Sequence, residues 1–141
     1  MLQIIRNDES VQAWCQANYT ALPNVNLGFD PADLPPADMY PLIDLDPIDH
    51  GDRGRGAAEH RRVLLLTCGV ADDAKKALGD NITELPGIDR VTELIFLVIA
   101  AIGASADLRG GYIEGVKVRK VEEILFPYFF MEAEIEIVKP V

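Results

Sequence analysis

The last part of the chain alternates between apolar and acidic residues, and this pattern constrains the fold more than any other feature. Between Tyr128 and Val138, every second residue is apolar: Phe129, Met131, Ala133, Ile135 and Ile137. Three glutamates lie between them: Glu132, Glu134 and Glu136. A period of two residues is typical of a strand with one face on a core and the other in water. The chain must therefore build a sheet with one buried face.

Other segments predict the neighbours of this strand. Segment 62–70 is apolar on both faces, as in a central strand that is covered on both sides. Segment 40–46 alternates from Ile43 onward and predicts a half-exposed strand, with Pro41 at a sheet edge or at the strand start. Segment 25–29 predicts a short strand, and segment 116–125 leads into the last one.

Three segments carry helical signals. Asn7 or Asp8 is a suitable cap for a helix that continues to about Tyr19. Segment 71–78 predicts a short helical piece that stops at the residues Gly-Asp-Asn after it. The main helix is expected from Asp89 to about Ala104.

The main helix is apolar almost all the way round. A helix of this kind must be covered on every side, and one sheet in a small domain covers only part of it. Phe96 and Ile99 lie among the residues that spread its apolar surface beyond a single stripe. We therefore expect a neighbouring subunit to cover the remainder. The most apolar run, 94–104, is much shorter than the roughly 20 residues of a membrane span, so no membrane is expected.

Composition narrows the function classes. The chain has 141 residues, which suits one domain, and a formal net charge of -10, from 13 basic and 23 acidic residues. That charge argues against broad binding to nucleic acid or to an anionic membrane. Cys15 and Cys68 lack the spacing of a metal site or a redox pair, and buried free thiols in a reducing compartment are expected. The first residues lack the features of a secretory signal, so synthesis and assembly in the cytoplasm are expected.

These patterns together predict one α+β domain over residues 1–141. Its sheet is expected to be mixed and largely antiparallel, with about four to five strands and helices packed on it. The segment 47–60 joins two of the predicted strands and is rich in glycine and charge. It is expected to form a flexible hairpin arm.

One acidic group is a candidate metal site. It consists of Asp44, Asp46, Asp49, His50 and Asp52, and aspartates at a strand end followed by a histidine are able to hold a hard divalent cation. Their spacing matches no complete metal motif. In the other interpretation, Asp44 and Asp46 form the solvent face of a strand and the rest belongs to a soluble loop. A nuclease version would also recruit Glu114 and Lys117.

Nucleophilic and phosphate-binding motifs are incomplete. Ser10, Ser105 and Cys68 lack the glycine elbow of a hydrolase, and the only histidines, His50 and His60, flank the predicted arm. The glycine-rich segment 51–56 lacks the lysine and hydroxyl of a phosphate loop. We therefore predict a protein that is not an enzyme, with no catalytic, cofactor-binding or metal-binding residues and no cofactor.

Two charged features allow two interpretations each. Arg53 and Arg55 either contact nucleic acid or an acidic partner, or form a solvated loop tip. The glutamates 132, 134 and 136 either keep an exposed sheet face soluble, or line an acidic surface that repels DNA or meets a basic partner. Together with Phe96, Ile99 and Phe130, these residues are the candidate interface: Arg53, Arg55, Phe96, Ile99, Phe130, Glu132, Glu134 and Glu136.

The order of segments resembles a known family. A helix is followed by LGFDPADLPPADMYPLIDLDP, a glycine-rich arm, HRRVLLLTCGV, an apolar helix and VEEILFPYFFMEAEIEIVKP. This order is similar to that of the tail-terminator and tail-completion proteins of long-tailed phages and prophages. The resemblance spans nearly the whole chain, and it depends on general patterns rather than on a catalytic signature.

The resemblance implies a structural subunit rather than an enzyme. It implies a homo-hexameric ring on the last ring of the tail-tube protein, which stops tube growth and presents a surface to head-completion or connector proteins. DNA would pass through the ring without specific binding. The protein would be found in the host cytoplasm during assembly and then in the tail or neck of the virion.

Three alternatives remain open. The first is another head–tail connector or minor tail protein of a phage. The second is a small metal-dependent hydrolase or nuclease that uses Asp44, Asp46 and His50. The third is an unrelated cytosolic binding module.

Overall fold

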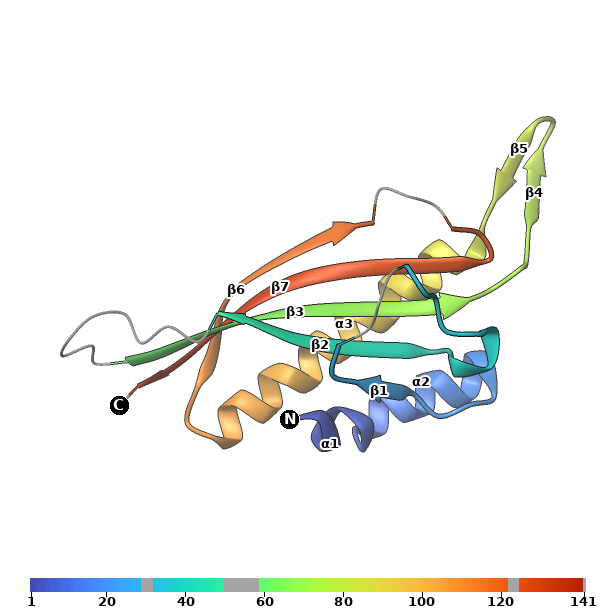
Figure 1. Cartoon of the computed structure of the whole chain (residues 1–141). Coiled ribbons are helices and arrows are strands. Elements are labelled where there is room, and N and C mark those ends of the chain that lie inside the picture. The colour runs from blue at the N-terminus through green and yellow to red at the C-terminus, as the bar shows by residue number, and fades with distance from the viewer. Residues whose placement is uncertain (29–31, 50–58, 122–124, 141) are drawn as a thin grey trace.

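A five-stranded sheet with helices on one face forms the body of the molecule (Figure 1). The computed structural model describes residues 1–28, 32–49, 59–121 and 125–140. In chain order its elements are α1 (Leu2–Arg6), α2 (Glu9–Tyr19), β1 (Asn24–Asn26), the short 3-10 helix η1 (Ala37–Met39), β2 (Leu42–Asp49), β3 (Glu59–Ala71), β4 (Lys76–Gly79), β5 (Ile82–Glu84), α3 (Pro86–Leu108), β6 (Tyr112–Lys120) and β7 (Tyr128–Pro140).

The strand order in the large sheet is β1-β2-β3-β7-β6. β1 and β2 are parallel, and every other neighbouring pair is antiparallel. The predicted α+β fold with a mixed, largely antiparallel sheet is thus confirmed. The two longest strands, β3 and β7, pair along their whole length in the middle of the sheet. β2 lies between β1 and β3, so Pro41 marks the strand start rather than a sheet edge.

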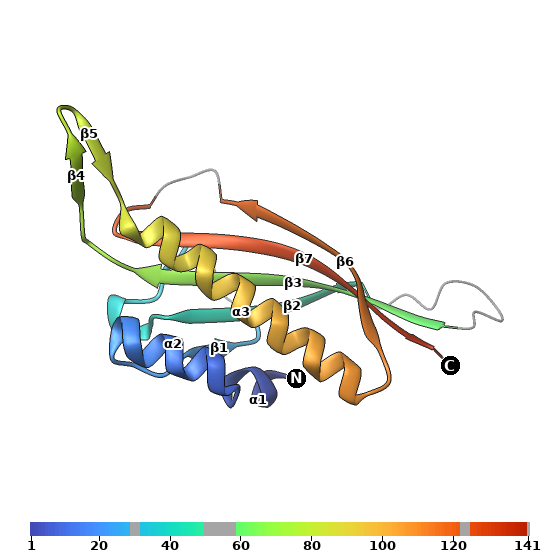
Figure 2. The same ribbon diagram turned by 180° about the vertical axis from the view of Figure 1, so that it is seen from behind.

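All three helices lie on one face of the sheet (Figure 2). α3 crosses the strands diagonally, and α1 and α2 both contact it. Asp8 caps α2 as predicted, because its Oδ1 accepts a hydrogen bond from the amide of Val11 at 3.0 Å. α3 is longer than expected: it begins at Pro86, a residue that suits the first helical position because it lacks an amide hydrogen. α1 was not predicted.

The region after β3 differs from the prediction. Segment 71–78 was expected to be helical, but the structure forms a separate two-stranded sheet from β4 and β5. Gly79 pairs with Ile82, so Asp80 and Asn81 make a two-residue hairpin loop. Asn81 has a positive φ of 61°, which tight hairpin turns require and asparagine tolerates. The residues that were interpreted as a helix stop are thus the turn of a hairpin.

The core lies between the sheet and α3. The buried residues of α3 include Val91, Leu94, Ile95, Val98 and Ile102, which pack against the inner faces of the strands. α1 and α2 extend this cover along the side of α3. Most of the apolar surface of α3 is therefore covered within the chain, and less remains for a neighbour than the sequence suggested. None of the described helices is long and apolar enough to cross a membrane.

Candidate functional site

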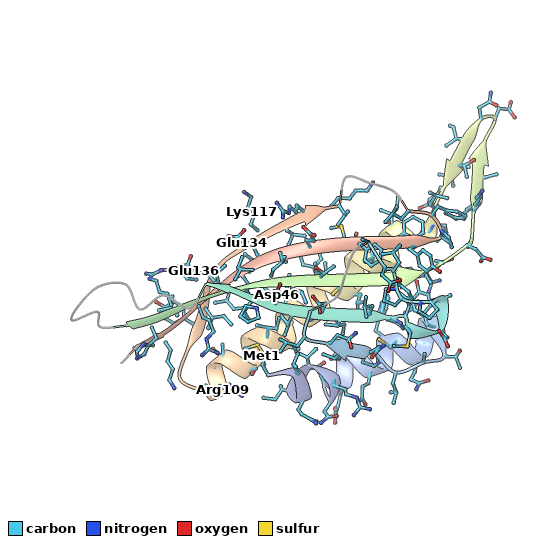
Figure 3. All side chains as sticks on the ribbon, in the orientation of Figure 1. Met1, Asp46, Arg109, Lys117, Glu134 and Glu136 are labelled. Carbon is cyan, nitrogen blue, oxygen red and sulfur yellow. The ribbon has the colours of Figure 1, made fainter. Side chains whose placement is uncertain are left out.

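The sheet face opposite the helices is the first candidate surface, and we call it the open face. Charged residues cross it in rows. The cross-strand register places an acidic residue of β2, a residue of β3, a glutamate of β7 and a basic residue of β6 side by side in each row. The first row is Asp44, Thr67, Glu132 and Arg119, and the second is Asp46, Leu65, Glu134 and Lys117. Figure 3 shows Asp46, Glu134 and Lys117 on successive strands of this face.

Basic residues on neighbouring strands pair with the glutamates of β7. The Nε atom of Arg119 lies 2.9 Å from Oε2 of Glu132. Arg61 on β3 pairs with Oε1 of Glu136 at 2.7 Å and also with Glu114 on β6. Glu134 is exposed and lies opposite Lys117. The face thus combines both signs of charge, so these glutamates do not form a bare acidic surface.

Asp44 is buried, unlike the solvent-facing residue that one interpretation of the sequence expected. Its exposed fraction is 4%, and its Oδ1 has no hydrogen-bond partner among the described residues. Burial raises the pKa of this carboxyl, the nearby charge of Asp46 raises it further, and a backbone hydrogen bond from Gly28 opposes the shift. Asp44 therefore carries an electrostatic cost that the exposed Asp46 does not.

The candidate metal group is not assembled in the part of the chain that the structure describes. Among those residues, no group of three or more His, Cys, Asp or Glu side chains has an arrangement that could hold a metal ion. His50, Asp52 and the side chain of Asp49 lie outside the described residues. Glu114 and Lys117, the extra residues of the nuclease hypothesis, lie on β6 opposite β7, where Glu114 pairs with Arg61.

Other candidates for chemistry are buried or isolated. Cys15 and Cys68 are free and buried, as predicted. Burial raises the pKa of the Cys15 thiol to about 11, and burial also raises the pKa of the Cys68 thiol well above its usual value. Protonated thiols are poor nucleophiles. Ser105 is also buried, and its hydroxyl has no hydrogen-bond partner among the residues described.

One predicted interface residue is buried. Phe130 is 8% exposed and packs with Tyr40 and Leu42 in a small second core at one end of the open face. The ring centroids of Tyr40 and Phe130 are 6.1 Å apart in an edge-on arrangement. Burial raises the pKa of Tyr40 to about 12. Phe130 therefore supports the segment before β2 and presents little surface to a partner.

The remaining predicted interface residues have different positions. Phe96 is 55% exposed on the outer side of α3, whereas Ile99 is half-buried and packs against the core. Phe96 thus remains a candidate contact. Arg53 and Arg55 lie outside the described residues, as does most of the predicted arm 47–60.

The hairpin of β4 and β5 is a second candidate surface, which the sequence did not reveal. It projects from the end of the body where β3 and α3 meet it, and neither strand pairs with the large sheet (Figures 1 and 2). All four residues of β4 are exposed, and Leu78 and Ile82 near the tip are 55% and 56% exposed. We call this element, residues 76–84, the projecting hairpin.

The root of the projecting hairpin is firmly attached to the body. Asp72, just after β3, accepts a hydrogen bond from the amide of Ala74 at 3.0 Å and one from the hydroxyl of Tyr19 on α2 at 3.5 Å. Its Oδ2 also lies 3.6 Å from Nε of Arg90 on α3. The guanidinium of Arg90 stacks over the ring of Tyr19, 5.7 Å from its centroid. One carboxylate therefore ties the hairpin root to both long helices.

No protein-family model matches the chain, and no curated protein matches it.

Proposed function

We propose that this chain is a structural subunit that assembles into a ring at the end of a phage tail tube and joins the tube to the head. The projecting hairpin is the observation that carries this proposal. An element of two short strands without further packing is marginally stable in water. Its exposed apolar residues gain free energy only when a partner covers them.

The position of the hairpin suits contact between copies. It extends away from the body at one end, whereas the start of β3 and the end of β7 lie at the other end (Figure 1). A contact between two different surfaces of identical subunits is heterologous, and such contacts generate a ring when the rotation closes. Leu78 and Ile82 are the residues that we expect to insert into the next subunit.

Charge is consistent with a ring through which DNA moves. The net charge of -10 disfavours adhesion of phosphate backbone to the subunit. In the part of the chain that the structure describes, Arg61 and Arg119 of the open face pair with glutamates of β7, which makes these two cations less available to hold DNA. The hexamer and its two partners, the tail-tube protein and a head-completion protein, are part of this proposal and follow from the family resemblance.

Sedimentation velocity tests the proposal. We expect the protein to form rings, either alone or after addition of tail tube, and Leu78→Ser with Ile82→Ser to abolish them. Leu22→Ser is the matched control, because Leu22 is 50% exposed but lies outside the hairpin. A strict monomer that binds neither tail tube nor head proteins would exclude the proposal. Binding to head proteins without binding to tube would favour the connector alternative.

A further inference from the structure

A pocket of about 380 Å³ lies beside the C-terminal end of α3, where that end faces β3 and β7. Its lining comes from the last turn of α3, the loop after it, the outer ends of the two central strands and the start of α1. The lining residues are Met1, His60, Arg61, Arg62, Ala106, Arg109, Gly111, Ile137 and Lys139. Figure 3 shows Met1 and Arg109 close together in this region.

The lining of this pocket has a charge opposite to that of the chain. Of the described residues that line it, four are arginine or lysine and none is aspartate or glutamate, although the whole chain has a net charge of -10. Arg61 is engaged by Glu114 and Glu136 on the open face. In the described part of the chain, no ion pair joins Arg62, Arg109 or Lys139 to a carboxylate. Within the described residues, Arg62, Arg109 and Lys139 thus line one pocket without a carboxylate partner.

The register of the strands explains why these cations gather. His60 lies opposite Lys139, and Arg62 lies opposite Ile137, which belongs to the core beneath the helices. Because side chains alternate along a strand, residues 60, 62, 137 and 139 share the helix side of the sheet. Arg109, the C-cap of α3, approaches the same space from the helix layer.

The pocket also has an apolar floor. Ala106 is 3% exposed and Ile137 is 9% exposed, so neither is well solvated. The amide of Gly111 donates to the carbonyl of Ala106 at 2.8 Å and is already satisfied. A ligand would therefore be held by the basic side chains, whose attraction is stronger beside an apolar wall than in bulk water.

We propose that this pocket binds a small anion that carries more than one phosphate group. Guanidinium groups bind phosphate through two parallel hydrogen bonds, and Arg62 and Arg109 supply two such groups while Lys139 adds a point charge. The volume is within the usual range for sites of small ligands. Inorganic pyrophosphate and a nucleoside triphosphate share this chemistry.

The position of the pocket beside the C-terminal end of α3 favours a ligand with several negative charges. The C-terminal end of a helix carries partial negative charge from its free carbonyl groups, which opposes an anion nearby. A ligand with a single negative charge would gain little binding free energy, because the helix end repels it. A ligand with several charges engages Arg62, Arg109 and Lys139 together, so pyrophosphate and ATP are expected to bind more tightly than inorganic phosphate.

Isothermal titration calorimetry of the full chain at low salt tests the proposal with phosphate, pyrophosphate and ATP as probes. We expect pyrophosphate or ATP to bind, and Arg62→Gln with Arg109→Gln to weaken binding about tenfold or more. Lys117→Gln is the matched control, because it removes one positive charge from the opposite face of the sheet. It should leave the affinity unchanged. If pyrophosphate alone binds, the ligand is an inorganic polyphosphate; if ATP binds more tightly, it is a nucleotide.

Two results of the calorimetry with phosphates would overturn the proposal. One is a lack of binding by both multivalent probes, and the other is equal weakening in Lys117→Gln, which would show only general charge attraction. Amide chemical shifts of the unsubstituted protein give a second measurement that does not depend on the folding of variants. Pyrophosphate should shift the amides of Arg62, Arg109 and Lys139, and shifts confined to other regions would also reject the site. Tighter binding of a short DNA duplex than of ATP would assign these cations to nucleic acid instead.

Discussion

Gly87, in the first turn of α3, packs directly against the phenyl ring of Phe129 on β7. A methyl group at position 87 would overlap that ring, so the start of α3 can approach the sheet closely only because residue 87 has no side chain. This contact sets where α3 leaves the projecting hairpin. It therefore anchors the chain three residues after β5, the second strand of the projecting hairpin.

We expect Gly87→Ala to lower the free energy of unfolding by about 1–3 kcal/mol, because overpacking of a dense core forces its neighbours to move. The matched control is Gly103→Ala in the same helix. A Cβ atom there would lie 3.5 Å from Cδ1 of Ile113, which is ordinary contact. Alanine is the better helix former, so Gly103→Ala should stabilise the protein by about 0.5–1 kcal/mol. Urea unfolding measures both, and equal effects would contradict the role of Phe129.

The carboxylate of Asp72 is a second group that anchors the projecting hairpin to the body. Asp72→Asn keeps the shape of the side chain but removes the charge that faces Arg90. We expect a loss of about 1 kcal/mol in the free energy of unfolding, since the pair is partly buried. If the hairpin mediates assembly, the fraction of rings in sedimentation should fall as well. Asp73→Asn, at an exposed neighbouring position, is the control and should change neither quantity.

The sequence revealed the long elements because their patterns extend over many residues. β7 could be recognised from its alternation, which arises because helices cover one face of the strand and the other is open. The hairpin of β4 and β5 could not, because strands of four and three residues carry too little periodicity to distinguish them from a helical turn. Asp80 and Asn81 were the local signal of a turn, since aspartate and asparagine are common in turns and asparagine tolerates a positive φ.

The surfaces were harder to predict than the strands. Alternation places the glutamates of β7 on one face, but the positions of Arg61 and Arg119 beside them depend on strand register, which no local pattern encodes. The basic pocket combines residues near positions 60, 109 and 139, and no motif links them along the chain. The burial of Asp44 also depends on how segments distant in sequence pack over it.

Asp44 makes stability depend on pH in a defined direction. Its pKa in the folded protein is raised above the usual value of 3.8, so the folded state binds this proton more tightly than the unfolded state. The stabilising contribution of the protonated group is complete below that value and is lost as pH rises through the folded pKa. Asp44→Asn should therefore stabilise the protein at neutral pH, and the gain should vanish below about pH 4.

Urea unfolding at a series of pH values measures this difference. Asp46→Asn serves as the control, because Asp46 is exposed on the same strand and its substitution should leave the pH dependence nearly unchanged. If the free energy of unfolding of Asp44→Asn depends on pH in the same way as that of the original protein, ionisation of Asp44 does not destabilise the folded state. The same variant at neutral pH also tests the hydrolase alternative, since assembly should persist whereas any measured hydrolysis that uses Asp44 should disappear.

The ion pairs of Arg61 and the ion pair of Arg119 on the open face should differ in their contribution to stability. Arg61 is 22% exposed and lies between two glutamates on separate strands, whereas Arg119 is 63% exposed and has one partner. Arg61→Met should cost about 1–2 kcal/mol, because it leaves Glu114 and Glu136 close together without a cation. Arg119→Met should cost no more than about 0.5 kcal/mol, as is usual for an exposed pair.

Added salt screens the repulsion between the two glutamates, so the cost of Arg61→Met should shrink in high salt while that of Arg119→Met stays small. Thermal unfolding at low and high salt separates the two, and equal costs at both positions would show that the Arg61 pairs act as ordinary surface contacts.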